Sequence, residues 1–359
     1  MNLLRILVLN NKIMDNSPSF KFRRYCDIEN NNNPKNISKI LEFDKTHDTG
    51  IWVALEKVHG CNFSFLIMKD EKGKFKIKIA KRTSIIEEGE ELNNININKL
   101  VGKYSGKLKE AFEMVENMSY SQSIKQLTIF GELFGGHYPH PSVPKFPGAK
   151  LCQTGVYYHN DNDFYAFDIH NGEKYLDYDV CMKIFEKCGF FYAAPLFSGK
   201  IKDAMEFPNT FETTIPSHYG HPSLGESNIA EGLVLKPMKN WYMPNGKRLI
   251  LKNKTVTYSE VDKKKTKKVM EDLDTIDKIW NEVESYITVN RLHNVQSHGN
   301  YHGKMLIGPL SNDVMKEFLR DEDEEITKLY RNLSDKQRKI FKKRLSNGCM
   351  KIVMKNLEE

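Results

Sequence analysis

Several features that mark other protein classes are scarce in this chain of 359 residues. Its six cysteines form no C-x-x-C pair, so we expect no structural zinc site. Sparse, unpatterned cysteine indicates a reducing compartment. We therefore expect an intracellular and cytoplasmic protein, and a mitochondrial address in the first 13 residues stays open. No run of about 18 apolar residues occurs, which excludes a transmembrane helix, and no internal repeat is visible.

Neither sign of charge dominates. Lysine and arginine number 54 against 47 acidic residues, a formal net charge of +7. So modest an excess is compatible with a nucleic acid or nucleotide partner but does not by itself indicate one. Hydrophobic residues make up 40% of the chain, enough for a packed interior. A chain of this length is typical of two domains.

The character of the chain changes twice along its length. Residues 1–19 are polar after a short apolar patch that lacks a signal-peptide core, which predicts a disordered extension. Residues 20–260 contain alternating strand patterns and an amphipathic helix at 98–118, typical of an α+β domain with antiparallel strands. After the lysine-rich run 263–268 the pattern is helical, so we expect a domain boundary near residue 260 and an all-helical domain at 261–359.

Two local patterns give sharper expectations. An asparagine-rich stretch containing Pro34, residues 30–36, predicts a loop. Ser334 and Gln337 have the spacing of a capping box, which predicts the start of a helix. Gly348 then predicts its end, because glycine favours the conformation that follows the last turn of a helix.

The most suggestive chemistry lies at Lys57, which follows an apolar strand pattern at residues 51–55 and precedes Gly60 by three positions. A lysine at a strand end beside a glycine turn suits a nucleophile that must approach a phosphorus atom. Free lysine titrates near pH 10.4, so a nucleophilic lysine needs a neighbouring cation or a desolvated site. The tetrapeptide K-x-x-G alone is a weak signal, because a lysine is usually solvated surface.

Four further clusters also place charged residues at strand ends, where side chains can converge over a sheet. Taken singly, each has an ordinary structural explanation, such as a surface ion pair, a solvated strand end, a core aromatic or a solvated edge strand. They are Ala80-Lys81-Arg82-Thr83, Phe130-Gly131-Glu132-Leu133, Phe167-Asp168, and Glu231-Gly232-Leu233-Val234-Leu235-Lys236 paired with Leu251-Lys252-Asn253-Lys254.

In this order the clusters resemble a known motif series. The order K-x-x-G, R-T, G-E, F-D, E-G-L-V-L-K and K-x-K is similar to that of the covalent nucleotidyltransferases, the ATP-dependent ligases and mRNA capping enzymes. Within them the chain most resembles the RNA ligase 2 type, including the kinetoplastid RNA-editing ligases. His59 supports this, since DNA ligases and capping enzymes usually carry aspartate there. Residues 130–141 and 290–295 add to the likeness, which runs from about Phe22 to residue 320.

The resemblance implies a fold and a reaction. The fold would be an antiparallel-sheet nucleotidyltransferase domain of the ATP-grasp-like ligase type, followed by a small all-α domain. The reaction would join 3′-OH and 5′-phosphate RNA ends through lysyl-AMP and AMP–RNA intermediates. ATP would donate the AMP and Mg²⁺ or Mn²⁺ would assist. The partner would be RNA, with nick sealing in a duplex as the expected task, and no protein partner is indicated.

The resemblance also implies which residues act. Lys57 would attack the α-phosphate of ATP, and Lys252 and Lys254 would stabilise the charge that develops there. Glu231 would help to position the divalent cation. The implied nucleotide-binding set is Glu56, Lys57, Val58, His59, Asn62, Arg82, Glu132, Phe167, Asp168, Glu231, Leu233, Lys252 and Lys254.

Within this set, the resemblance implies how the nucleoside would be held. Phe167 would stack on adenine, and Leu233 would form the opposite wall, where many relatives carry an aromatic residue. Glu56 and the Val58 backbone would meet the adenine edge. Glu132 would accept a hydrogen bond from a ribose hydroxyl, and Arg82 and Asn62 would lie near the ribose and phosphate.

Two alternatives remain open at this point. A DNA ligase or capping enzyme belongs to the same superfamily, but these usually continue into an OB-type β-barrel after K-x-K, where this chain has a helical pattern. A non-catalytic RNA-binding relative would bind RNA without transferring AMP. The intact Lys57, Lys252 and Lys254, together with both glutamates, argue against such decay.

Overall fold

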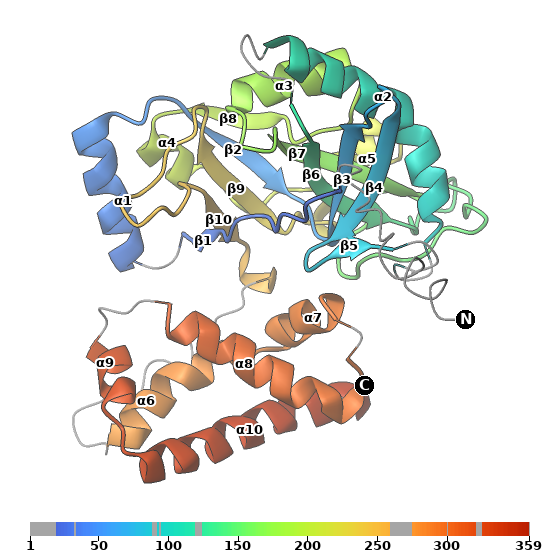
Figure 1. Cartoon of the computed structure of the whole chain (residues 1–359). Helices are drawn as coiled ribbons and strands as arrows, with labels where there is room; N and C mark the ends of the chain where they lie inside the picture. The colour runs from blue at the N-terminus through green and yellow to red at the C-terminus, as the bar shows by residue number, and fades with distance from the viewer. Residues whose placement is uncertain are drawn as a thin grey trace, which may run out of the picture.

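The computed structural model describes residues 19–31, 34–87, 92, 95–118, 124–258, 275–299, 301–320 and 325–358. Two β-sheets with their covering helices form one part, and five helices form a second part beside it (Figure 1). The fold class is therefore α+β with antiparallel sheets and a helical C-terminal region, as predicted. The extension expected before residue 19 and the boundary expected near residue 260 lie outside the described residues. None of the helices in the described ranges is long and apolar enough to cross a membrane.

The first sheet has the strand order β1-β10-β9-β2-β8, and only its β1–β10 pair is parallel. Its interior strand β2, between β9 and β8, is buried from Trp52 to Glu56, and Lys57 is its first partly exposed residue. The apolar run of β2 is continuous because both faces of the strand are covered. Its last residues, Leu55 to Lys57, reach a cavity. The strands are β1 Glu29–Asn30, β10 Leu251–Lys254, β9 Gly232–Pro237, β2 Trp52–Lys57 and β8 Pro195–Gly199.

The second sheet is antiparallel throughout and has the order β5-β4-β3-β6-β7. Its central strands are almost wholly buried, and β4 alternates apolar and lysine residues as its sequence predicts. The largest hydrophobic cluster contains residues of both sheets, including Val53, Leu55, Phe63 and Phe65. The strands are β5 Ile85–Ile86, β4 Phe75–Lys81, β3 Cys61–Lys69, β6 Leu127–Gly135 and β7 Asn162–His170.

Five helices cover these sheets. The amphipathic helix expected at 98–118 is confirmed as α2, Ile97–Met118, which packs on β3 and β4. The loop expected at 30–36 is wrong in part, because Asn30 belongs to β1 and α1 begins at Pro34, where a proline in the first turn costs no hydrogen bond. The remaining helices are α1 Pro34–His47, α3 Tyr178–Lys187, α4 Ile201–Glu206 and α5 Ile215–His218.

The C-terminal helices enclose their own apolar cluster, which contains Trp280, Leu310 and Phe341. The capping box is confirmed, since the Ser334 N–H donates to Gln337 Oε1 at 3.0 Å. The helices are α6 Thr275–Val283, α7 Val289–Ser297, α8 Ile307–Phe318, α9 Glu325–Arg331 and α10 Asp335–Glu358.

The predicted helix end at Gly348 is wrong, because α10 continues to Glu358. A Cβ atom at Gly348 would lie 2.8 Å from the Trp280 ring and 2.9 Å from Ile287 Cδ1. The glycine is therefore required for close approach between α10 and its neighbours, and it does not terminate the helix.

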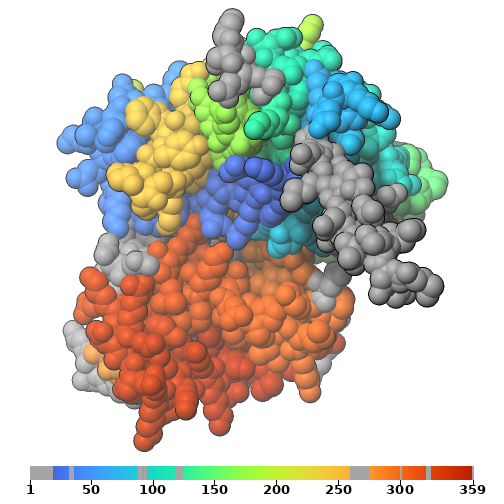
Figure 2. Space-filling model, viewed as in Figure 1, coloured from blue at the N-terminus to red at the C-terminus, as the bar shows by residue number. Residues whose placement is uncertain are grey.

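The N-terminal segment 19–31 lies at the seam between the two parts. In Figure 2 it is the blue surface directly above the orange and red helices. Arg320, just beyond α8, makes an ion pair with Glu29 at 3.0 Å, and Asn30 Nδ2 donates to Glu317 Oε1 at 3.0 Å. The segment therefore carries polar contacts that join the sheets to the helical part.

Close strand packing at Gly131 gives a test of the fold. A Cβ atom there would lie 2.3 Å from the Phe164 ring and 2.5 Å from the Tyr165 carbonyl oxygen. We expect Gly131→Ala to lower the free energy of unfolding by at least about 2 kcal/mol, measured by urea denaturation. Gly102→Ala, in α2 with nothing within 4 Å, is the control and should stabilise by about 0.5–1 kcal/mol. Equal effects of the two substitutions would contradict this packing.

Candidate active site

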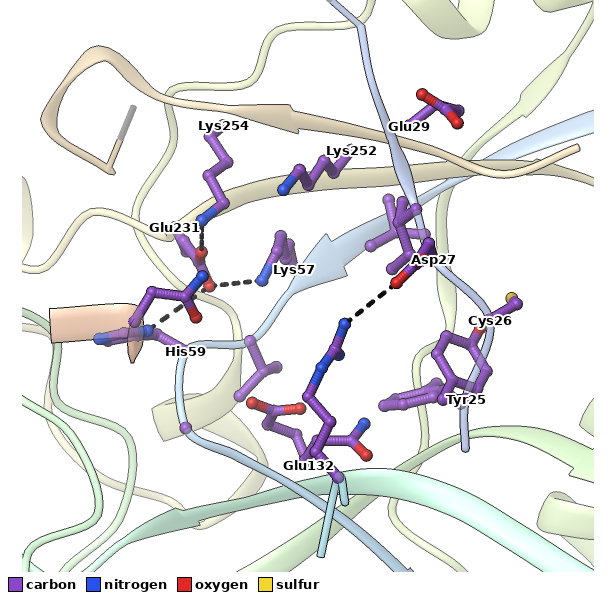
Figure 3. Close-up of a pocket in the computed structure, with 18 of the residues that line it drawn as sticks. Tyr25, Cys26, Asp27, Glu29, Lys57, His59, Glu132, Glu231, Lys252 and Lys254 are labelled. Atoms are coloured by element: carbon purple, nitrogen blue, oxygen red, sulfur yellow. Dashed lines mark hydrogen bonds and ion pairs between the residues drawn. The ribbon is translucent and has the colours of Figure 1, made fainter. Parts of the chain in front are cut away.

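A cavity of about 920 Å³ lies where the ends of both sheets meet the helical part (Figure 3). Residues from the N-terminal segment, the strand ends, α7 and α8 line it. The structure brings most of the predicted site residues together here. Those that line the cavity are Glu56, Lys57, Val58, His59, Asn62, Arg82, Glu132, Phe167, Glu231, Lys252 and Lys254. Asp168 and Leu233 do not line it.

Three strand ends carry the charged centre of the cavity. Lys57 ends β2 and Lys254 ends β10, and both are paired in register with Gly232, the residue after Glu231. The Lys57 Nζ atom lies 2.7 Å from Glu231 Oε2, and the Lys254 Nζ atom lies 3.0 Å from Glu231 Oε1. Figure 3 shows the two lysines converging on the carboxylate from different strands. Strand register thus places one carboxylate between two ammonium groups.

The electrostatics of Glu231 follow from this placement. Its side chain is only 3% exposed, and burial alone would raise its pKa. Lys57 and then Lys254 outweigh burial and lower the pKa of Glu231 to about 2. The carboxylate is therefore charged at neutral pH. Because a buried charge without partners is costly, Glu231 holds both lysines in position.

His59 lies at the edge of this group. Its Nδ1 atom is 3.7 Å from Glu231 Oε2, and its ring centroid is 5.4 Å from that of Tyr258. Burial lowers the pKa of His59, and the nearby Glu231 carboxylate only partly opposes this, so the imidazole is neutral at pH 7. Gly60 follows in a tight turn, where a Cβ atom would lie 2.3 Å from the Leu133 carbonyl oxygen.

The second sheet supplies the opposite wall. Asn62 on β3 and Glu132 on β6 are register partners, so both side chains reach the cavity from neighbouring strands. Burial raises the pKa of Glu132 to about 7, although Lys57 acts to lower it. Arg82 follows β4, and its Nη2 atom lies 3.5 Å from Asp27 Oδ1. This wall presents hydrogen-bonding groups to the part of the cavity that contains Lys57 and Lys254.

Phe167 and Val234 are among the apolar residues that line the cavity, and Leu233 is not. Leu233 is fully buried in the cluster that contains Trp52 and Leu235, away from the cavity. Simple alternation from Glu231 would place Leu233 on the cavity side. Gly232 breaks this alternation with a φ of +143°, so Glu231 and Val234 both line the cavity.

Glu56 lines the cavity, but its carboxylate is held elsewhere. It accepts hydrogen bonds from the Thr214 backbone N–H at 2.9 Å, from the Thr214 hydroxyl at 2.6 Å and from the Thr213 hydroxyl. Burial raises the pKa of Glu56 and these bonds oppose the rise. Neighbouring residues on β2 point to opposite faces, so the Glu56 side chain lies away from Lys57 and its backbone meets the cavity.

Asp168 is a fully buried anchor outside the cavity lining. Arg248 binds both of its carboxylate oxygens, at 2.8 and 3.0 Å, and Lys236 Nζ lies 3.0 Å from Oδ1. The Tyr25 hydroxyl donates to its Oδ2 at 2.5 Å. Burial acts to raise the pKa of Asp168, but Arg248 and Lys236 lower it to about 2. The structure therefore gives Asp168 ion-pair partners beneath the cavity and no exposed surface.

Sequence reasoning missed the contribution of the N-terminal segment. Tyr25 lines the cavity and is 4% exposed, and its ring centroid lies 4.9 Å from that of Phe167. No local pattern predicts this contact, because the two residues are far apart in the chain. Residues of α7 and α8, such as His293 and Lys316, also line the cavity. For α7, the likeness noted at 290–295 was the available signal.

Within the described ranges, no group of three or more histidine, cysteine, aspartate or glutamate side chains is arranged to hold a metal ion. Each oxygen of Glu231 already lies within 3.0 Å of a lysine nitrogen. Among the residues that the structure describes, the side chains around Glu231 therefore do not by themselves form a metal site. A divalent cation at this place would need oxygen ligands from a bound phosphate group.

The two sheets whose strand ends carry this cavity, and the helices that follow them, match two family descriptions. The family description "RNA ligase" matches residues 50–254, and "T4 RNA ligase 2 C-terminal" matches residues 270–351. The chain belongs to the RNA ligase family.

Two curated relatives come from Trypanosoma brucei brucei. The mitochondrial RNA-editing ligase 2 is 32% identical over 266 residues, which cover 67% of this chain and 61% of the relative. The mitochondrial RNA-editing ligase 1 is 26% identical over 245 residues, covering 58% and 52%. The chain thus spans between about half and three fifths of these relatives. A solved Naegleria gruberi RNA ligase mutant with ATP and Mn has a TM-score of 0.43 and 16% identity, covering 67% of this chain and 59% of that one.

The raised pKa of Glu132 predicts a pH-dependent stability. Its folded pKa of about 7 exceeds the ordinary value of 4.5, so this group's contribution to stability is lost as the pH rises through 7. Glu132→Gln lacks this loss. We compare the free energy of unfolding of the variant with that of the wild type. We expect this difference to shift in favour of the variant by about 1–2 kcal/mol between pH 5 and pH 8.5, after allowance for the partial exposure of the side chain.

Urea denaturation at both pH values measures this gain. Glu113→Gln, on the exposed face of α2, controls for the loss of a carboxylate. A Glu132→Gln difference that is the same at pH 5 and pH 8.5 would contradict the electrostatic account of this wall.

Proposed function

We propose that this chain is an ATP-dependent RNA ligase that joins 3′-OH and 5′-phosphate ends through a lysyl-AMP and an AMP–RNA intermediate. The observation that carries the proposal is the pairing of Lys57 with buried Glu231 at 2.7 Å, beside Lys254, in a cavity lined by further cations. Membership of the RNA ligase family supports it.

In the first step Lys57 Nζ attacks the α-phosphorus of ATP. The new bond is N–P, the bond to the β-phosphate oxygen breaks, and pyrophosphate leaves. Lys57 must give up a proton to solvent before it can attack. The second oxygen of Glu231 has Lys254 within 3.0 Å, so the carboxylate keeps a cationic partner after Lys57 becomes neutral. The Glu231 carboxylate, shared by both lysines, keeps the Lys57 side chain in position while Lys57 changes from charged to neutral.

The cavity walls suit the rest of the nucleotide. Adenine would fit between Phe167 and Val234, and base–aromatic stacking contributes about 1–3 kcal/mol. Glu132 would accept from a ribose hydroxyl. Lys252 and Lys254, which alternate along β10, would face the α-phosphate and stabilise the charge of the transition state.

ATP as the AMP donor, with Mg²⁺ or Mn²⁺, is part of the proposal. A divalent cation, when bound with the triphosphate, supplies charge neutralisation there. Glu231 was predicted to help hold that cation. Because its oxygens lie beside Lys57 and Lys254, Glu231 would need to exchange a lysine for the cation, and its metal role stays a prediction.

In the later steps the AMP passes to an RNA 5′-phosphate, and a 3′-hydroxyl attacks that phosphate and releases AMP. We propose a nick in duplex RNA as the substrate. The helical part supports this, because α7 and α8 place polar and basic side chains on the same cavity as Lys57. The two trypanosome relatives are named mitochondrial. The cytoplasmic location and the 20–260 and 261–359 domain division stay predictions.

Transfer of label from α-labelled ATP tests the reaction. We expect the wild type to become covalently labelled in the presence of Mg²⁺, and Lys57→Ala to remain unlabelled. Lys254→Ala should label about a hundred- to a thousandfold more slowly, because one charged contact to the transition state is lost. Lys239→Ala, whose lysine pairs with Asp179 outside the cavity, is the control and should label normally. Label that survives Lys57→Ala would refute the assignment.

The substrate arms of the same experiment separate the alternatives. Replacing ATP with GTP should abolish labelling, whereas a capping-type enzyme would accept GTP. Sealing of a nicked duplex should require RNA at the nick, whereas a DNA ligase would seal nicked DNA as well. RNA binding with no labelling would indicate a non-catalytic relative.

The two neighbouring residues of β9 should respond differently to truncation. Val234→Ala removes a cavity wall, so we expect a roughly three- to thirtyfold higher KM for ATP in the labelling reaction with little loss of stability. Leu233→Ala leaves a cavity in the core, because the side chain is fully buried. We expect the free energy of unfolding to fall by about 2–4 kcal/mol and the KM for ATP to stay unchanged. The opposite pattern would show that Leu233, and not Val234, contacts the base.

A further inference from the structure

A cluster of cations surrounds one carboxylate at the mouth of the cavity, and Lys57 does not belong to it. Asp27 Oδ1 lies 3.0 Å from Arg24 Nη2 and 3.5 Å from Arg82 Nη2. The cations come from the N-terminal segment, from the residue after β4 and from the α8 region. They are Arg24, Arg82, Lys316 and Arg320, and all four line the same cavity as Asp27.

Lys316 and Arg320 act on the same carboxylate. Burial would raise the pKa of Asp27, but Arg24 first and then Lys316 and Arg320 lower it. Arg320 is partly committed elsewhere, because Glu29 lies 3.0 Å and Glu317 lies 3.4 Å from its guanidinium nitrogens. The four cations nevertheless carry one positive charge more than Asp27, Glu29 and Glu317 together compensate.

Stability does not explain this arrangement. The side chain of Asp27 is 51% exposed and that of Arg24 is 46% exposed, and exposed ion pairs contribute little to stability. The Arg82 contact is long, at 3.5 Å, and both of its side chains are partly exposed to solvent. Figure 3 shows Asp27 on the segment that crosses the cavity opposite Lys57, with its ion pair directed into the space between them. The carboxylate is therefore a replaceable occupant of a cationic site.

We propose that Arg24, Arg82, Lys316 and Arg320 form a phosphate-binding site, and that the Asp27 carboxylate occupies it until a phosphate group of the substrate displaces it. This rests on the proposed function. A phosphate carries more charge than a carboxylate and offers more oxygen acceptors to guanidinium groups. On binding, Arg82 turns from Asp27 to the phosphate, and Asp27 moves into solvent. Asp27 thus weakens phosphate binding and keeps Arg82 ordered in the empty protein.

Two sources can supply this phosphate. One is the β,γ-phosphate tail of ATP, which lies beyond the α-phosphate that Lys57 attacks. The other is the RNA backbone at the joint between the sheets and the helical part, because Lys316 and Arg320 belong to the α8 region. The chemistry is the same, and binding measurements with each ligand distinguish them.

Removal of the Asp27 charge tests the proposal. Equilibrium binding is measured for Asp27→Asn with α,β-methylene-ATP, with AMP, and with a nicked RNA duplex in the absence of ATP. We expect about three- to tenfold tighter binding of the methylene-ATP, or of the RNA, than in the wild type. If RNA is the source, the slope of log Kd against log salt should steepen by about one. Lys316→Gln should weaken binding of the same ligand.

Asp179→Asn removes an equal charge from an ion pair outside the cavity and is the matched control. If Asp179→Asn tightens binding as much as Asp27→Asn does, the proposed site is wrong. It is also wrong if Asp27→Asn tightens binding of neither methylene-ATP nor RNA. If Asp27→Asn tightens the binding of AMP and of methylene-ATP equally, the effect lies at the α-phosphate, and this result would also contradict the proposed site. None of these measurements needs turnover, so they stay interpretable if AMP transfer to Lys57 fails.

Discussion

The buried carboxylate of Glu231 is the constraint on which the cavity depends. At 3% exposure its charge is tolerable only because Lys57 and Lys254 each lie within 3.0 Å. Those three residues come from three strand ends, so the register of β2, β9 and β10 brings the ion group together at the point where chemistry is proposed. The same group gives Lys57 a defined direction, which a solvated strand-end lysine lacks.

A second buried carboxylate organises the floor of the cavity. Asp168 is bound by Arg248, Lys236 and Tyr25, and through Tyr25 it draws the N-terminal segment against Phe167. That segment then carries Asp27 to the mouth and contacts the α8 region through its next residues. One carboxylate thus holds Lys57 in position, and the other holds the N-terminal segment against Phe167. Both have pKa values lowered to about 2 because cations outweigh burial.

Periodic patterns made the strands, α2 and the capped start of α10 predictable, since period and capping are local properties. Two predictions failed at glycines, because the role of each glycine depends on tertiary contacts that the local sequence does not show. Gly348 permits contact with Trp280 where it was expected to end a helix. Gly232 interrupts the strand alternation, so that Leu233, which the resemblance placed at the nucleotide, lies in the core. The partners of Asp27 and Tyr25 were unpredictable, since they lie far away in the chain and share no local pattern with them. The order of the motifs, by contrast, named eleven residues that the structure places along one cavity.

The proposed reaction requires that Lys57 receives AMP. Peptide mapping by mass spectrometry, after incubation of the protein with ATP and Mg²⁺, detects this step. We expect a single AMP adduct per chain, on the peptide that contains Lys57, with the fragment ions placing it on that side chain. An adduct on any other residue, or none on folded protein that binds ATP, would contradict AMP transfer to Lys57.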